Sequence, residues 1–344
     1  MRRDRISRLA EFRTRYTNET YQQAHSALHA SLPPIPPAAS DEQRNFEADI
    51  FDELLKCHAR FTEYSFGVRR VHPQPDTIKL ELESPQRGED LLRQILPVYE
   101  PDLSEVHGLP GLRISERTKQ GIELHISGRR TSVWLTGLPP AAWRRAENAV
   151  LRSTNELFWW PLWRGSDEWT VQEHASEERW NTGEWTRHIH AGAWCTSGLL
   201  RRLPSFHTIV PADVITGYKG LGVLGYDGIG PVRWVLDLDY SPGVPHYKDQ
   251  LVEALTDPDF GLPLTPAHHL EQALGRPLPS NMVRLDDTAR TSLIELRFST
   301  GMHRAFAQQH QPQYEEIVER VRRIQQQHRT WPRGGQPLSP VSQS

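Results

Sequence analysis

Two histidines, His188 and His190, stand two residues apart in the most tryptophan-rich part of the chain, and Cys195 follows closely. Nine of the eleven tryptophans lie between Trp134 and Trp194. In a strand, the alternation of side chains would place both imidazoles on one face, where imidazole and thiolate groups suit zinc. The alternative is a pair of buried histidines that hydrogen-bond to backbone or carboxylate groups. His188 and His190 are therefore a candidate metal site.

Asp237 and Asp239 share one face of a predicted strand at 233–240 whose other face is apolar. Two neighbouring carboxylates repel unless a cation or an arginine joins them, so the pair is a candidate ledge for a divalent metal ion. The string VLDLDYSPG (235–243) resembles the acidic strand motif of archaeo-eukaryotic primase-polymerases, which implies two metal ions that clamp a nucleotide triphosphate. Those enzymes also need a later histidine motif and a third acidic strand, which the sequence does not offer. An amphipathic strand with a solvated acidic face is the preferred interpretation.

A glycine-rich stretch at 217–231 matches neither common phosphate-binding pattern. GxxxxGK[ST] is absent, and GLGVLG at 220–225 matches GxGxxG only in its letters, because the following YDGIGP does not start a helix. The sequence contains no nucleophile elbow and no Ser-His-Asp order. No cofactor is predicted, and whether the protein is an enzyme stays open.

Arginines crowd the predicted helices at the two ends of the chain. The helix at 4–16 carries Arg5, Arg8, Arg13 and Arg15. The helix at 313–328 carries Arg322 and Arg323 near its end, and Arg329 directly follows it. Beside aromatic rings, such arginines can neutralise phosphates and stack on bases, which makes them candidate nucleic-acid ligands. The opposing interpretation pairs the basic first helix with an acidic helix at 41–61 in the same chain.

Composition limits the class of protein. A chain of 344 residues with 37% hydrophobic residues can bury about two domains' worth of core. The net charge of −3 excludes a protein that coats nucleic acid with its whole surface. Two cysteines cannot build a disulfide framework, and no apolar run approaches membrane-spanning length. We expect a soluble cytoplasmic protein without a membrane partner, and its oligomeric state stays open.

Apolar periodicity predicts the elements that position these residues. Strands are predicted at 64–71, 77–83, 112–117, 121–127 and 131–137, and helices at 86–97 and 139–153. This order predicts an α+β fold of mostly antiparallel sheets with helices packed on one face and an N-terminal helical arm. The predicted domains are a basic helical arm at 1–30, a proline-rich linker at 31–40, an α+β module at 41–153, a tryptophan-rich α+β module at 154–328 and a disordered tail at 329–344.

Several segments of the first half resemble a group of uncharacterised actinobacterial proteins, some of them associated with plasmids or integrated elements. They are the RYTNETYQQA pattern at 15–24, SFGVRRVHPQPDTIKLEL at 65–82, HGLPGLRI at 107–114 and SVWLTGLPPAAWRRAE at 132–147. The resemblance covers about residues 1–150 and implies an accessory protein of a mobile element. It brings no catalytic residues with it.

Three functions remain. The leading hypothesis is a non-enzymatic accessory protein that contacts nucleic acid or a nucleoprotein partner through the arginines of the terminal helices. The rival is a metal-dependent hydrolase or nucleotidyl-transfer enzyme that uses Asp237 and Asp239, or His188 and His190. The third is a protein-interaction module whose exposed tryptophans form an apolar patch larger than a monomer normally shows. We expect most of the tryptophans to form the interior of the second module.

Overall fold

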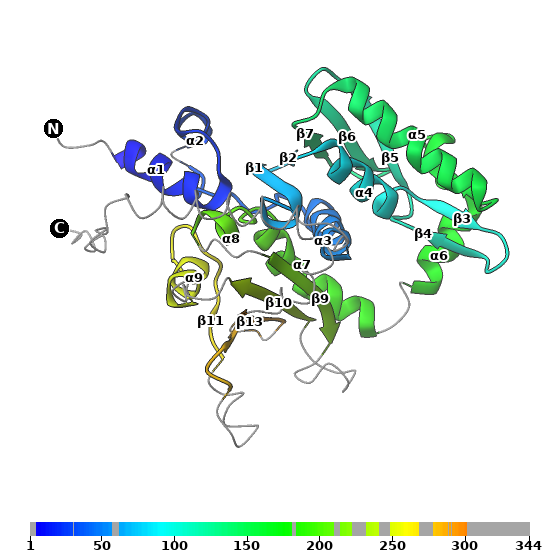
Figure 1. Ribbon diagram of the computed structural model, residues 1–344. Helices are drawn as coiled ribbons and strands as arrows, with labels where there is room; N and C mark the ends of the chain where they lie inside the picture. The colour runs from blue at the N-terminus through cyan, green and yellow to red at the C-terminus, as the bar shows by residue number, and fades with distance from the viewer. Residues whose placement is uncertain are drawn as a thin grey trace.

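The computed structural model describes residues 5–29, 31–56, 62–180, 184–209, 214–221, 232–240, 248–267, 278–287, 289 and 291–300 (Figure 1). Its helices are α1 (Arg5–Thr17), α2 (Tyr21–Ala27), α3 (Asp41–Lys56), α4 (Pro85–Ile95), α5 (Pro140–Glu156), α6 (Val171–Trp180), α7 (Glu184–Leu200), α8 (Ser205–Thr208) and α9 (Lys248–Leu255), with 3₁₀ turns at Ser65–Gly67 and Leu162–Arg164. The predicted helix at 313–328 and the predicted tail lie outside the described residues.

The first sheet has the order β1-β2-β7-β6-β5 and is antiparallel except for the β2–β7 pair. Its strands are β1 (Val68–Gln74), β2 (Thr77–Leu82), β5 (Leu112–Arg117), β6 (Gly121–Ile126) and β7 (Val133–Thr136). Alternation along these strands turns apolar side chains toward α4 and α5, which cover one face of the sheet (Figure 1). The predicted α+β fold, with helices on one face, is therefore confirmed.

A small second sheet lies at the end of this module, with the order β4-β3-β8. Its strands are β3 (Val98–Glu100), β4 (Glu105–His107) and β8 (Trp160–Pro161). The third sheet has the order β11-β12-β13-β10-β9, in which only β10 and β13 run parallel. Its strands are β9 (Val214–Leu221), β10 (Val232–Tyr240), β11 (Thr265–Pro266), β12 (Met282–Asp286) and β13 (Ser292–Thr300).

Helix α3 joins the two large sheets into one continuous core. The Phe51 ring lies 5.8 Å from the ring of Trp234 on β10 and 6.1 Å from that of Phe66, just before β1. Buried residues of both sheets belong to the same apolar cluster. The first and the third sheets therefore share an interior.

A buried ion pair fixes α3 to α7 and to the proline-rich linker. Arg201, just after α7, donates to both carboxylate oxygens of Glu47 at 2.7 and 2.5 Å and to the carbonyls of Pro36 and Gln74. Ser197 donates to the same carboxylate at 2.6 Å, and both charged side chains are 0% exposed. One guanidinium thus holds four segments of the chain together.

The N-terminal helical arm is docked on the protein. Phe12 and Tyr16 of α1 stack on Phe260 with ring centroids 5.7 and 5.5 Å apart, and the Tyr16 hydroxyl donates to the Ala254 carbonyl. The ion pair that Arg13 makes is with Glu19, so it does not bind the acidic helix α3. None of the helices described here is long and apolar enough to cross a bilayer.

Candidate interaction site after helix α5

Helix α5 ends in a turn of four consecutive apolar residues, 157–160, which we call the aromatic turn. The Phe158 N–H donates to the Asn155 carbonyl at 3.1 Å, and the Trp159 N–H donates to the Thr154 carbonyl at 2.9 Å. These bonds form a Schellman ending, in which the residue after the cap is left-handed and is usually glycine. Here that residue is Phe158, with φ +58°.

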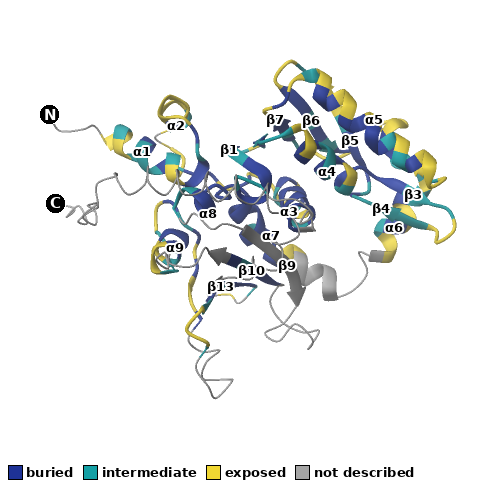
Figure 2. Ribbon diagram, in the orientation of Figure 1, coloured by how far each residue is buried: buried dark blue, intermediate teal, exposed yellow. Residues whose placement is uncertain are grey.

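The aromatic turn is exposed although its residues are large and apolar. Phe158 is 86% exposed, Leu157 54% and Trp160 52%, and Leu103 at the tip of the β3–β4 hairpin is 61% exposed. Figure 2 shows this region at the far end of the first module, where α5 meets β3 and β4. Exposed apolar side chains that lie close together are typical of binding surfaces.

Neighbouring rings hold the two tryptophans of the turn in place. Trp160 pairs in register with Tyr99 of β3, and their ring centroids lie 5.4 Å apart. Trp159 stacks on His107 at 4.8 Å, and the His107 ring is bonded to Glu100 at 2.6 Å. The turn is therefore an ordered feature of the fold, and Phe158 is its most exposed ring.

Acidic side chains surround the aromatic turn. Glu100 and Glu105 are direct cross-strand partners, a placement in which like charges repel. Asp102 at the hairpin tip and Glu156 at the end of α5 are both exposed. In the described chain, basic groups near the turn include Arg152, one turn earlier on α5, Arg93, which donates to the Ser153 hydroxyl, and Arg179, which donates to the Ser104 carbonyl. The surface is thus apolar at its centre and mainly acidic at its rim.

The segment that follows the turn is anchored to the first sheet by Arg113 of β5. Its guanidinium binds both Glu173 oxygens at 2.9 Å and the Ser166 and Glu168 carbonyls at 3.0 and 2.8 Å. Burial alone would raise the pKa of Glu173, but these charged hydrogen bonds, with those from Thr170 and Gly111, hold it below its ordinary value. Residues 160–173 thus lie against the first sheet, whereas the sequence placed them in the second module.

The histidine pair does not lie on the predicted strand. Residues 184–200 form helix α7, so the strand alternation that would place both imidazoles on one face is absent from this segment. The His190 side chain is exposed, and the His188 side chain lies outside the described residues. Cys195 is 0% exposed, and burial raises the pKa of its thiol to about 12, so it offers no thiolate. The predicted strand is therefore wrong, and a metal-binding role for His188 and His190 stays a prediction.

Asp237 lies on the predicted strand, with an arginine beside it. Its register partner on β13 is Arg297, whose guanidinium approaches the Asp237 carboxylate to 3.9 Å and Glu295 to 2.5 Å. Burial raises the pKa of Asp237, and Glu295 adds to this increase. The Asp239 side chain is not among those described. Within the described chain, no group of three His, Cys, Asp or Glu side chains is placed to hold a metal ion.

The predicted nucleic-acid ligands divide into three groups. Arg5, Arg8 and Arg15 are exposed on α1, as a phosphate ligand requires. Arg13 is 1% exposed and bonded to Glu19 at 2.6 Å, so its assignment to nucleic acid is wrong, because its charge is used inside the fold. Arg322, Arg323 and Arg329 lie outside the described residues.

The tryptophans fill both roles that the sequence left open. Trp143, Trp163 and Trp234 are at most 4% exposed and belong to the core, whereas Trp160 is half exposed. The aromatic turn was missed as a site because glycine or asparagine is expected where Phe158 stands. The available signal was a run of four apolar residues directly after a helix, without a glycine to end it.

Comparison of the chain with protein-family models, with curated proteins and with solved structures finds no match in any of the three.

Proposed function

We propose that this protein is a non-enzymatic binding module that docks a partner protein through the aromatic turn. The observation that supports this is Phe158, which is held in the left-handed conformation while it is 86% exposed. That conformation costs a residue with a Cβ atom roughly 1–2 kcal/mol. An exposed ring buries little apolar surface, so its packing does not offset this cost in the folded state. Ordered residues with a strained backbone are frequent at binding sites.

A partner that covers the Phe158 ring gains substantial free energy. A phenylalanine offers about 200 Å² of surface. At 86% exposure, about 170 Å² remains for a partner, which corresponds to about 4 kcal/mol if it is fully buried. Leu157 precedes Phe158 and Trp160 follows two residues later, and both are about half exposed, so they can take part in the same contact and exclude water from it. A central aromatic residue with such neighbours has the form of a binding hot spot.

The acidic rim selects the chemistry of the partner. Glu100, Asp102, Glu105 and Glu156 favour a segment that carries arginine or lysine next to apolar residues. The same charges disfavour two copies of this chain that meet through the aromatic turn, because the two rims would repel. The proposed partner is thus a different protein with a basic, partly apolar segment.

The metal-dependent alternative is not part of this proposal, because His188 and His190 lie on a helix and not on the predicted strand, and Arg297 lies beside Asp237. A cytoplasmic accessory role in a mobile element is part of it. Its support is the resemblance of residues 1–150 to uncharacterised actinobacterial proteins.

The proposal is tested with a random peptide library displayed on phage and selected on three immobilised proteins. They are the native chain, Phe158→Gly, and Tyr21→Ala, which removes a 48% exposed ring on α2 as the matched control. The native chain and the control should select the same basic and apolar sequences. Burial of half the Phe158 ring is worth about 2 kcal/mol, so Phe158→Gly should weaken synthetic versions of these peptides about 30-fold. Peptides that bind Phe158→Gly as tightly as the native chain would contradict the proposal, as would a selection that enriches none.

A further inference from the structure

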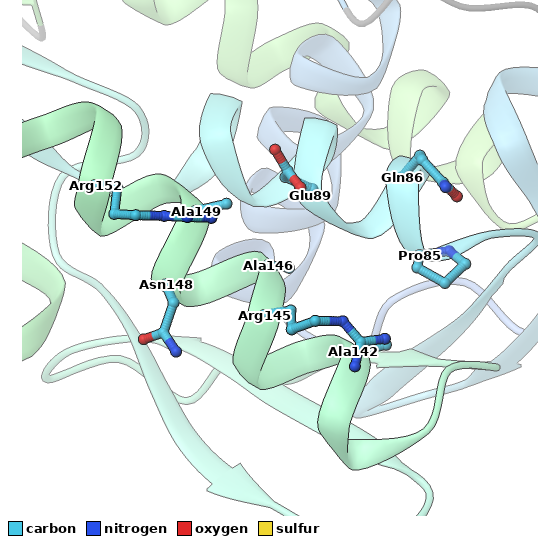
Figure 3. A pocket seen from close by; sticks show the side chains of 9 residues that line it. All are labelled: Pro85, Gln86, Glu89, Ala142, Arg145, Ala146, Asn148, Ala149 and Arg152. Carbon is cyan, nitrogen blue, oxygen red and sulfur yellow. The ribbon is translucent and has the colours of Figure 1, made fainter.

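A groove on the outer face of the first module lies between α4 and α5 and extends along α5 to Arg152, five residues before the aromatic turn. Its volume is about 710 Å³, and it is lined by Gln86 and Glu89 of α4 and by Arg145, Asn148 and Arg152 of α5 (Figure 3). Alanines line it on the α5 side, where larger side chains would fill it. The groove is open, so a long ligand can pass along it.

The charge of this groove is positive. Its carboxylate, Glu89, is bound to Arg93 at 2.8 Å, so its charge is compensated. Arg145 and Arg152 are exposed, and in the described part of the chain neither forms an ion pair or a side-chain hydrogen bond. Two guanidiniums are therefore in excess, and no ion pair or side-chain hydrogen bond within the described residues compensates them.

The spacing of the two arginines selects a ligand with repeated anionic groups. Arg145 and Arg152 are seven residues apart, which puts them on one face of α5 and about 10.5 Å apart along its axis. A nucleic-acid strand carries a phosphate on every nucleotide, so it offers each of the two guanidiniums its own anionic group. The amides of Gln86 and Asn148 at the groove margins can bond to phosphate or sugar oxygens.

We infer that the α4–α5 groove binds the phosphodiester backbone of nucleic acid through Arg145 and Arg152. This site differs from the terminal helices that the sequence indicates. It shares Arg152 with the border of the aromatic turn, and its other lining residues lie outside that turn. It makes no base-specific contact, so it binds without strong preference for sequence.

The test measures fluorescence anisotropy of a labelled single strand of about 15 nucleotides, and of its duplex, over a series of salt concentrations. The variant Arg145→Gln with Arg152→Gln is compared with the native chain. Its matched control is Arg5→Gln with Arg8→Gln, which removes two exposed charges from α1. The association constant varies with the salt concentration raised to a power of about −0.7 to −0.9 for each phosphate contact. The groove variant loses two such contacts, so it should bind about 25- to 60-fold more weakly at about 0.1 M salt. Its salt slope should fall by about 1.4–1.8 while the control keeps the native slope.

Three results would overturn the inference. The first is a control that loses the slope while the groove variant keeps it, which would place binding on α1. The second is a native chain that binds neither oligonucleotide at low salt. The third is a polyglutamate chain of equal charge that competes as well as the oligonucleotide, which would indicate an acidic protein ligand. Circular dichroism should show that both variants are folded, because all four arginines are exposed.

Discussion

Two phenylalanines of this chain provide a matched test of what Phe158 does. Phe66 and Phe158 both have a left-handed backbone, with φ +53° and +58°. Their burial differs, since Phe66 is 4% exposed and Phe158 86%. The same substitution, Phe→Gly, therefore changes backbone strain and chain entropy by similar amounts at both positions. Only the loss of buried apolar surface distinguishes the two variants.

The expected difference follows from the buried areas. With about 200 Å² per phenylalanine, Phe66 buries about 190 Å² and Phe158 about 30 Å². At about 25 cal/mol per Å², Phe66→Gly loses about 4.8 kcal/mol and Phe158→Gly about 0.7 kcal/mol. In both variants, relief of left-handed strain stabilises the fold by roughly 1–2 kcal/mol. The greater chain entropy of glycine in the unfolded state opposes this by roughly 0.5–1 kcal/mol. Phe158→Gly should therefore leave the free energy of unfolding nearly equal to that of the native chain. The free energy of unfolding of Phe66→Gly should be about 4 kcal/mol lower than that of Phe158→Gly.

Equilibrium urea unfolding, followed by circular dichroism and by tryptophan fluorescence, measures both free energies. Equal destabilisation by the two substitutions would refute the reasoning, because Phe158 would then support the fold and would not be available for a partner. A stable Phe158→Gly variant that also loses peptide binding would separate the binding role from the structural role.

Three further predictions concern buried groups. Arg201→Met leaves the Glu47 carboxylate buried without its cation and should cost about 3–5 kcal/mol; adding Glu47→Met should restore part of this loss in urea unfolding, and strict additivity of the two would contradict it. In the folded protein the pKa of Glu173 is lowered from its ordinary value of 4.5, so on acidification the unfolded chain binds the proton before the folded chain does. The ionised Glu173 therefore contributes fully to stability above pH 4.5. This contribution is lost as the pH falls through the folded pKa, and Glu173→Gln should flatten the fall of Tm on acidification, whereas an unchanged profile would count against the Arg113 contact. Because burial raises the pKa of Cys195 to about 12, its thiol in a Cys57→Ser background should react with Ellman's reagent only after denaturation, and rapid labelling of the native protein would disprove its burial.

The first sheet was predictable because alternation along its strands is regular. Ile78, Leu80 and Leu82 all face the core of the folded chain, as a period of two requires. The segment at 184–200 was not predictable in the same way, since two histidines give too short a pattern to distinguish a strand from a helix. Placement of 160–173 on the first sheet depends on Arg113 and Glu173, which are 60 residues apart and leave no local signal.

The aromatic turn marks a different limit of sequence reasoning. Helix ends are recognised by glycine or asparagine, because these residues adopt the left-handed conformation at low cost. Phe158 adopts it at a cost, so the rule that identifies ordinary helix ends passes over this one. The tryptophans mislead for a related reason, since Trp143 in the core and Trp160 at the surface have the same composition signal.

The contacts of Arg201 have a consequence for how the chain is divided. The linker at 31–40 contributes the Pro36 carbonyl to this guanidinium and buries Ile35 and Ala38, so it is not a hinge between independent units. A fragment cut before α7 would expose the apolar face of α3 and leave Glu47 buried without Arg201. The two sheets should consequently melt in a single cooperative transition, and expression of either half alone should yield aggregated chain.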